Sequence, residues 1–251
     1  MKKEREGTIV KNNQGCSMKC IQYINALNIT IKFLDEYGYT KKTCWANFIK
    51  GKVHNPYVAT VYGIGIIGDK YSIKAKEFQA WCDLLFRTTE SFKSKNPTYE
   101  KVTVCEEWLY YPNFYEWLHS QENFDKWFNG RRWCVDKDIL FKNNKIYSPD
   151  TCCLVPNKIN TLFVKKNANR GLYPIGVTKN HDNYMALCSN PYEGTNHVYL
   201  GTYDTPEKAF DKYKIYKENL IKKIAEEEYL NGVITEKCYE AMKRYIVEID
   251  D

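Results

Sequence analysis

Ten cysteines give this 251-residue sequence its widest choice of side-chain chemistry. A disulfide framework at this density is typical of small secreted domains, but here the cysteines are scattered and no C-x-x-C pair indicates a zinc ribbon or a thioredoxin-type motif. Two alternatives stay open. Either the thiols are reduced and partly buried, or four of them converge on a structural zinc: Cys105, Cys134, Cys152 and Cys153.

A basic segment offers a second kind of chemistry. Residues 164–183 contain four basic residues and one acid, Asp182, for a local charge of +3. The basic residues are Lys165, Lys166, Arg170 and Lys179. A segment with this bias often follows the phosphate backbone of a nucleic acid, and equally often it is a solvated connection. We interpret its basic residues as candidate DNA contacts.

Other catalytic patterns are missing from the sequence. Gly63-Ile-Gly65 lacks the third glycine of a dinucleotide-binding loop and is interpreted as a tight turn. His54 and His119 each lie alone, and no serine or cysteine nucleophile has a histidine nearby in the sequence. A small-molecule substrate is therefore not expected.

Composition and charge limit the class of protein. The longest apolar run, Val58 to Ile67, is far shorter than a membrane span and is interpreted as a buried strand. Glu4 and Glu6 interrupt the basic N-terminus and no apolar core follows, so we expect a soluble, cytoplasmic protein without membrane contact. The net charge of +6 permits a polyanionic partner, and 15% aromatic residues indicate packed domains instead of a disordered basic tail.

The elements that position these residues divide into three segments, which predict a multi-domain α+β protein. Residues 1–70 contain β-rich runs such as Ile29 to Phe33, in which apolar and polar residues alternate, and predict a small β-barrel-like domain. Residues 71–163 combine aromatic residues at helical spacing with two short strands and a helix, a β-hairpin followed by a helix (ββα). Residues 164–251 form the third predicted domain.

The C-terminal segment has the clearest pattern. It predicts three short antiparallel strands, Tyr173 to Thr178, Asn183 to Ser189 and His197 to Thr202, followed by a helix that Thr205 caps. The apolar stripe of this helix should cover one face of the sheet and leave the other face free: Ala209, Tyr213, Tyr216, Leu220 and Ile224. Thr235 caps a last short helix.

The same segment resembles the Apetala-two (ethylene-response-factor) DNA-binding domain over about sixty residues. The most specific match is the string Leu200-Gly-Thr-Tyr-Asp-Thr-Pro-Glu-Lys-Ala. In that family the sheet lies in the major groove, which implies that these side chains face DNA: Thr178, Asn180, Ser189, His197 and Tyr199. Lys179 and His181 in the adjoining turn would reach phosphates. The plant proteins place arginines on this face, so the resemblance implies binding with reduced sequence specificity.

Residues 57–163 resemble HNH-type endonucleases of phages and mobile elements in their organisation, and the resemblance is specific only over residues 134–163. The matching strings are Val104-Cys-Glu-Glu-Trp, Asp136-Lys-Asp-Ile-Leu, Asn144-Lys-Ile-Tyr-Ser-Pro-Asp-Thr-Cys and Val155-Pro-Asn-Lys-Ile-Asn. The resemblance implies that Asp136 is a metal ligand, that Lys137 occupies the position of the catalytic base and that Asn160 is the helical ligand, with Asp138 as a further carboxylate. No cofactor is certain, and Mg²⁺ is expected only if the protein cleaves DNA.

A lysine in place of the base histidine disfavours catalysis. Its ordinary pKa, near ~10.4, must be depressed before it can accept a proton, whereas two neighbouring carboxylates stabilise the charged form. We therefore expect a phage or mobile-element protein that binds double-stranded DNA with weak or lost cleavage activity, in the cytoplasm of a host cell. Two alternatives remain: an active Mg²⁺-dependent nicking endonuclease, and a protein that inhibits a host defence or regulatory complex.

Overall fold

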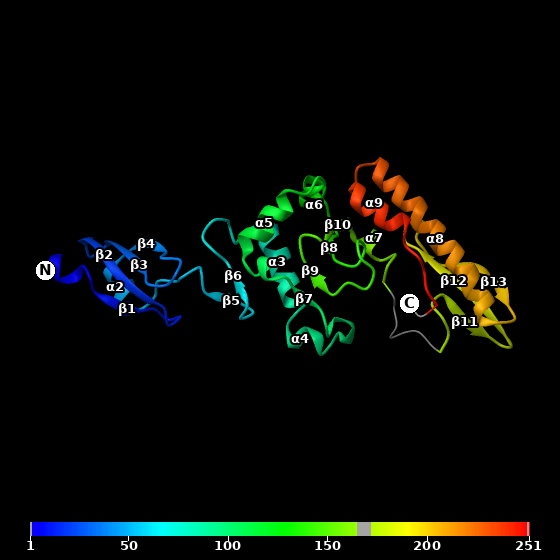
Figure 1. Cartoon of the computed structure of the whole chain (residues 1–251), viewed down its shortest axis with the longest axis horizontal. Coiled ribbons are helices and arrows are strands. Elements are labelled where there is room, and N and C mark those ends of the chain that lie inside the picture. Colours follow the sequence, from blue (N-terminus) through cyan, green and yellow to red (C-terminus); the bar gives the residue numbers. More distant parts are fainter. Residues whose placement is uncertain (1, 165–171, 250) are drawn as a thin grey trace. The chain divides into compact units, whose positions relative to one another are not determined.

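The computed structural model describes residues 2–164, 172–249 and 251 (Figure 1). Helices and several small sheets alternate along the chain, which confirms the predicted α+β class. The chain divides into two compact units, residues 1–89 with 106–115, and residues 90–105 with 116–251. Within the described ranges no helix has both the length and the apolar character needed to cross a lipid bilayer.

The first unit begins with a short helix α1 (Lys2–Arg5) and a four-stranded antiparallel sheet in the order β1-β2-β3-β4. Its strands are β1 (Ile9–Lys11), β2 (Ser17–Asn25), β3 (Asn28–Phe33) and β4 (Thr40–Thr43). The predicted alternation in β3 is confirmed, because Ile29, Ile31 and Phe33 are fully buried. The described pairing leaves β1 and β4 as edges, so the sheet is open where a barrel was predicted. Helix α2 (Trp45–Ile49) covers its apolar face with Phe48 instead (Figure 1).

The rest of the first unit is a hairpin and an aromatic core. The buried strand predicted over Val58 to Ile67 is wrong: β5 (Ala59–Val61) and β6 (Gly65–Ile66) form a hairpin, because the chain reverses at Tyr62 and Gly63, both at positive φ. The predicted aromatic helices are confirmed as α3 (Lys76–Phe86), η2 (Glu106–Leu109) and α5 (Tyr111–His119). Their fully buried rings form the core, and the Trp81 indole N–H donates to the carbonyl of Trp108 at 2.7 Å.

In the second unit, the strands of the predicted ββα segment pair differently from the prediction. Strand β8 (Trp133–Asp136) pairs antiparallel with β10 (Cys153–Pro156), whereas β9 (Ile146–Tyr147) pairs in parallel with β7 (Thr103–Val104). The predicted hairpin of β8 with β9 is therefore wrong. The chain leaves the sheet directly after β8, and the completely buried run of β10 supplies the partner strand. The remaining helices of this segment are α4 (Glu90–Lys93), η1 (Pro97–Tyr99), α6 (Phe124–Asn129) and α7 (Asn157–Asn160).

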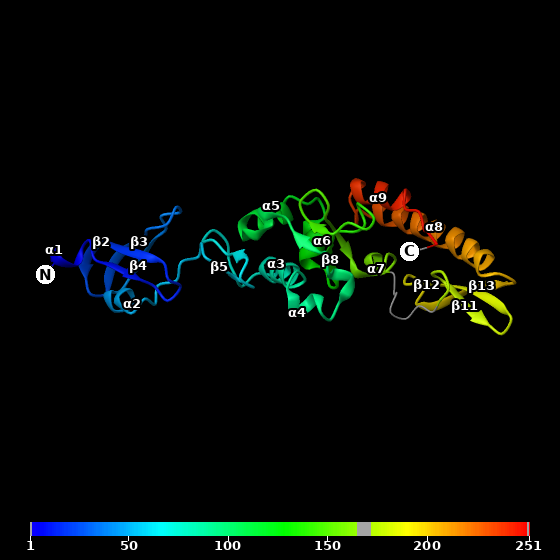
Figure 2. The same ribbon diagram turned by 60° about the horizontal axis from the view of Figure 1, so that its bottom comes forward.

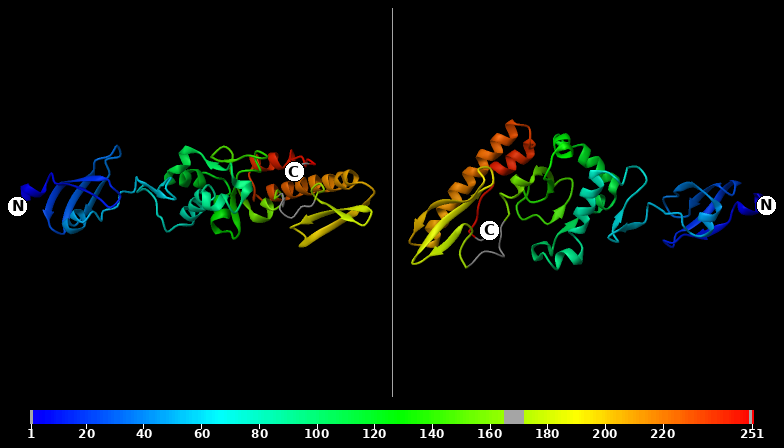
Figure 3. Two further views of the ribbon diagram at one scale, coloured as in Figure 1. Left: turned by 90° about the horizontal axis from the view of Figure 1, so that it is seen from below. Right: turned by 180° about the vertical axis from the view of Figure 1, so that it is seen from behind.

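The C-terminal segment forms the predicted three-stranded sheet and the two helices, but its first strand begins at Val177 and not at Tyr173 as predicted. Its antiparallel strands are β11 (Val177–Asn180), β12 (Asn183–Asn190) and β13 (Thr195–Tyr203), and helix α8 (Pro206–Leu230) runs along one face of this sheet (Figures 2 and 3). The Thr205 side chain accepts a hydrogen bond from the backbone N–H of Lys208, as predicted for a helix cap. Thr235 caps α9 (Glu236–Lys243) in the same way.

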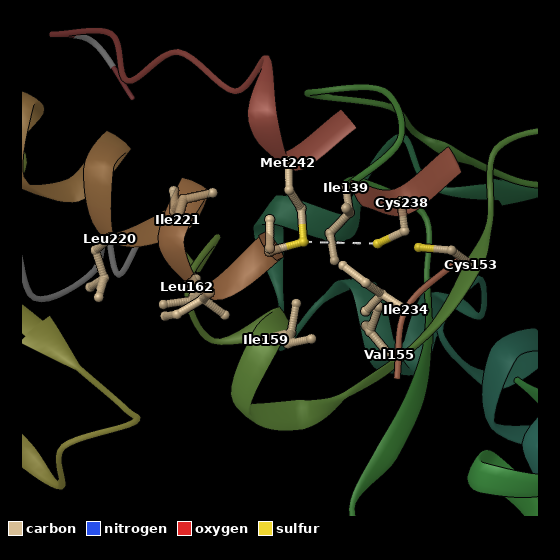
Figure 4. Close-up of a cluster of buried hydrophobic side chains, with 12 residues drawn as sticks. Ile139, Cys153, Val155, Ile159, Leu162, Leu220, Ile221, Ile234, Cys238 and Met242 are labelled. Carbon is tan, nitrogen blue, oxygen red and sulfur yellow. Dashed lines mark hydrogen bonds between the residues drawn. The ribbon is translucent and has the colours of Figure 1, made fainter. Parts of the chain in front are cut away.

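Helix α8 contributes to two hydrophobic clusters, which refines the predicted stripe. Ala209 and Tyr213 pack beneath the sheet with Val177 and Ala186. Leu220 and Ile224 belong instead to a cluster with β10, α7 and α9, in which the thiols of Cys153 and Cys238 lie side by side (Figure 4). Only the first half of α8 therefore supports the sheet.

Candidate nucleic-acid interface

Strand register divides the side chains of the β11–β13 sheet between two faces. Val177 lies opposite Ala186, and Cys188 lies opposite Val198. Val177, Ala186 and Cys188 are buried against α8. Because neighbouring residues in a strand point to opposite faces, the residues between them form the face that α8 does not cover.

We call this uncovered surface the open face, defined by Thr178, Asn180, Ser189, His197 and Tyr199. All five side chains are exposed, and all five are the side chains that the sequence resemblance assigned to DNA. On the same face, the hydroxyls of Tyr199 and Thr202 are hydrogen-bonded at 2.8 Å. No Asp or Glu occurs in the three strands, so the open face carries no negative charge from its own strands.

Close packing beneath the sheet fixes the open face in place. Gly176 has a φ of +76°, and a Cβ on it would lie 2.0 Å from Cδ2 of Tyr213 in α8. Only glycine combines this backbone conformation with so close an approach. Lys217, also on α8, is buried, and its burial lowers the pKa of its ammonium group. The helix-covered side of the sheet is therefore a packed core, and α8 does not reach the opposite side.

The remaining predicted DNA contacts are placed less favourably. Lys179 lies within β11 opposite Tyr184, so its side chain starts from the face that α8 covers, although it is exposed at the sheet edge. His181 is in the β11–β12 turn with a φ of +53° and is exposed. Lys165, Lys166 and Arg170 lie outside the described residues.

The structure adds four residues to the open face that the resemblance did not supply. Strand register places Met185 opposite Thr202 and Leu187 opposite Tyr199, and Asn183 follows on the same side of β12. The two apolar side chains are half-buried at the centre of the face. Counting back from Ser189 in steps of two residues identifies these positions on β12, so the alternation in the sequence already contained the signal.

The predicted metal ligand Asp136 serves as a backbone cap. Its Oδ1 accepts hydrogen bonds from the backbone N–H groups of Asp138 and Ile139, both at 2.8 Å. The side chain is buried at the end of β8, and that burial raises the pKa of its carboxyl above the ordinary aspartate value, with the charge of Asp138 acting in the same direction. The geometry explains why the chain turns away from the sheet here.

Lys137, at the position of the catalytic base, is held by other groups. Its Nζ contacts both carboxylate oxygens of Asp138 at 2.7 Å and donates to the carbonyl of Asn144 at 3.0 Å. The rings of Tyr99 and Tyr147 lie within 6 Å of the ammonium group. Lys137 is therefore a buried contact that joins Asp138 to the backbone at Asn144.

These residues do not fit a magnesium ion. Both oxygens of Asp138 face an ammonium group, and Asp136 is engaged with backbone N–H groups. Asn160 ends the short helix α7, where it is half-buried. Nor do Cys105, Cys134, Cys152 and Cys153 form a zinc site. In the described part of the chain, no three His, Cys, Asp or Glu residues are grouped so that they could hold a metal.

Comparison with known proteins gives no assignment. No family model, no curated protein and no solved structure matches the chain.

Proposed function

We propose that this protein binds double-stranded DNA through the open face of the β11–β13 sheet. One observation supports this proposal most strongly: the polar side chains of the open face are exposed on one side of a narrow sheet whose strands contain no acidic residue. A narrow β-sheet fits the major groove of B-form DNA, where hydroxyl, amide and imidazole groups can bond to base edges.

The side chains of the open face suggest what kind of binding this is. Thr178, Ser189 and His197 offer single hydrogen bonds, and none of them supplies the two-pronged contact with which arginine recognises guanine. We therefore propose binding of low sequence specificity, in the host-cell cytoplasm, by a protein related to the HNH-type endonucleases of phages and mobile elements. Cleavage is not part of the proposal, because Lys137 and Asp138 are engaged with each other.

The test is a gel-shift titration of the full chain with a 40-base-pair duplex at about 50 and 200 mM salt. The wild-type protein should bind, and the affinity should fall steeply between the two salt concentrations because phosphate contacts release counterions. The variant Thr178→Glu/His197→Glu places two carboxylates on the open face and should weaken binding at least about tenfold.

A matched variant carries the same two added acids elsewhere. Ile215 and Asn219 are exposed on α8, so Ile215→Glu/Asn219→Glu should weaken binding much less than the open-face variant. Equal losses in the two variants, or no shift of the duplex by the wild-type chain at the lower salt concentration, would contradict the proposal.

A further inference from the structure

The positive charge of the chain is concentrated in its N-terminal segment. Residues 1–55 contain ten Lys and Arg against four Asp and Glu, a net charge of +6. Residues 56–251 contain 27 of each kind and are neutral overall. The whole net positive charge of the protein therefore belongs to the segment that carries the β1–β4 sheet, not to the segment with the open face.

The fold places part of this excess on one surface. Met18 and Ile31 point into the core that α2 covers, so the alternate residues of each strand point outward. Every strand contributes one exposed lysine to this outer face, and we call these four residues the lysine stripe: Lys11, Lys19, Lys32 and Lys42.

Strand register gives the spacing of the lysine stripe. Lys19 lies directly opposite Lys32. Lys11 lies opposite Ser17, which is two residues from Lys19, and Lys42 lies opposite Thr30, which is two residues from Lys32. With ~4.8 Å between strands and ~3.3 Å per residue, successive lysines start roughly 5–8 Å apart, over a width of about 14 Å. The stripe is a continuous diagonal across the sheet.

Nothing in the described part of this segment neutralises the stripe. The four strands contain no acidic residue, and no ion pair of the described residues involves any of the four lysines. The acids of residues 1–55 lie outside the strands, and Asp35 is occupied by the Gly38 backbone N–H and the side-chain amide of Asn55. Like charges directly opposite each other destabilise a sheet, so the pair Lys19 and Lys32 is unfavourable without an anionic partner.

We propose that the lysine stripe is a second DNA-binding surface, which holds the phosphate backbone of a duplex without reading its sequence. A duplex carries one negative charge per ~1.7 Å of its axis, so a face of this width meets several phosphates at once. Gln22 and Thr30, joined by a hydrogen bond of 3.2 Å, lie beside the lysines and add polar groups. The proposal extends the function proposed above and does not depend on the open face.

The chemistry of this face favours a duplex over two other polyanions. Among its outward-pointing residues none is aromatic, whereas proteins that bind single strands stack bases on aromatic rings. A membrane-binding surface presents a broad apolar layer beneath its lysines. The strands here expose Ile9, Ile21 and Ile24, but Gln22 and Thr30 lie between the lysines and interrupt such a layer. Backbone contact with a duplex needs only the charge and the spacing.

The test compares two double variants of the full chain that remove the same charge. Lys19→Gln/Lys32→Gln changes the stripe, and Lys50→Gln/Lys52→Gln changes exposed lysines at and beyond the end of α2, outside the stripe. Affinity for a 40-base-pair duplex of arbitrary sequence is measured from about 50 to 300 mM salt. The stripe variant should reduce the slope of log affinity against log salt by about 2 and weaken binding roughly 10- to 100-fold near 0.1 M salt.

The control variant should keep the wild-type slope. Removal of the opposed lysine pair should leave the urea midpoint equal to or above that of the wild type, so that a loss of binding is not a loss of fold. Unchanged binding by the stripe variant, or the same loss in both variants, overturns the proposal. So does binding to phosphatidylserine vesicles that the stripe variant alone loses while it still binds the duplex. Failure of Thr178→Glu/His197→Glu to weaken binding contradicts the open face and leaves the stripe standing.

Discussion

At the scale of single residues, the two side chains that resemble an endonuclease centre stabilise the fold instead. Asp136 holds two backbone N–H groups, and Lys137 joins Asp138 to the carbonyl of Asn144. Both residues are buried. Their spacing in the sequence is the same whether they bind a metal or cap a turn, so the sequence could nominate them but could not distinguish the two roles.

The cap at Asp136 predicts that Asp136→Asn and Asp136→Ala differ in their effect on stability. Asp136→Asn keeps an oxygen acceptor for both backbone N–H groups and should leave stability near the wild-type value at low pH. Asp136→Ala leaves Asp138 and Ile139 without that acceptor and should lower the free energy of unfolding by about 2–3 kcal/mol. Urea unfolding at one pH measures both, and equal losses in the two variants would contradict a capping role.

The raised pKa of Asp136 also predicts a pH dependence. Below ~3.9, the ordinary aspartate value, both folded and unfolded states hold the proton. Above it the unfolded state ionises first and binds fewer protons than the folded state, so the Asp136 contribution to stability falls until the pH passes the raised folded pKa. Asp136→Asn cannot titrate. Its stability relative to the wild type should therefore grow with pH across this window, and a constant difference would show that the carboxyl is not shifted.

Lys137 should matter for stability where an exposed lysine does not. Its side chain is only 6% exposed, whereas Asp138 is 44% exposed and partly screened by solvent. Lys137→Met should lower the free energy of unfolding by about 1–2 kcal/mol. The control Lys208→Met removes a pair whose side chains are both more than 60% exposed, and its effect on stability should be much smaller because solvent screens the pair. Similar losses in the two variants would show that the Lys137 contacts add little.

At the scale of elements, the sequence predicted the features that depend on neighbouring residues, such as helix caps, strand alternation and turns. The cap at Thr205, the alternation in β3 and the turn at Gly63 are all found in the structure. Strand pairing was not predictable in the same way: β8 pairs with β10 across a long loop, and nothing in the composition of β9 excludes it as the partner. The five residues that the resemblance assigned to DNA do lie on the side of the sheet that α8 leaves uncovered, whereas their contact with DNA stays a prediction. A two-residue period could have added the positions on β12 that the resemblance missed.

The support of the open face by α8 predicts a strong effect at Gly176. Gly176→Ala combines an unfavourable positive φ with a clash against Tyr213, and should lower the free energy of unfolding by about 3 kcal/mol. Gly194 also has a positive φ, but no atom lies within 4 Å of the position that its Cβ would take. Gly194→Ala should therefore lose only about 1 kcal/mol. If urea unfolding gives the same loss for both, the contact with Tyr213 is not tight.

At the scale of the whole molecule, the charge and the sheet that fits a groove lie in different units. The lysine stripe belongs to the first unit and the open face to the second. The strands of the open face contain one charged residue, Lys179. Under the two proposals, the lysine stripe would therefore supply attraction to the DNA backbone and the open face would supply contact with the bases. A chain with two linked binding surfaces gains affinity only when one ligand can engage both.

This division predicts a dependence on duplex length. Wild-type affinity per site should rise as duplexes are lengthened from about 10 to 60 base pairs, because longer DNA can engage both surfaces. The variant Lys19→Gln/Lys32→Gln should lose most of this rise, while Lys50→Gln/Lys52→Gln should keep it. Fluorescence anisotropy with end-labelled duplexes measures the effect. Identical length profiles for the wild type and the stripe variant would show that the two surfaces do not act on the same DNA.

Helix α8 has one more consequence. It is a single helix of 25 residues, and its first half belongs to the core beneath the open face while its second half belongs to the cluster with β10 and α9. Because the two halves form one continuous helix, unfolding of either core removes part of the helix that supports the other. The second unit should therefore unfold as one cooperative unit, and proteolytic cleavage near the middle of α8 should unfold both cores together.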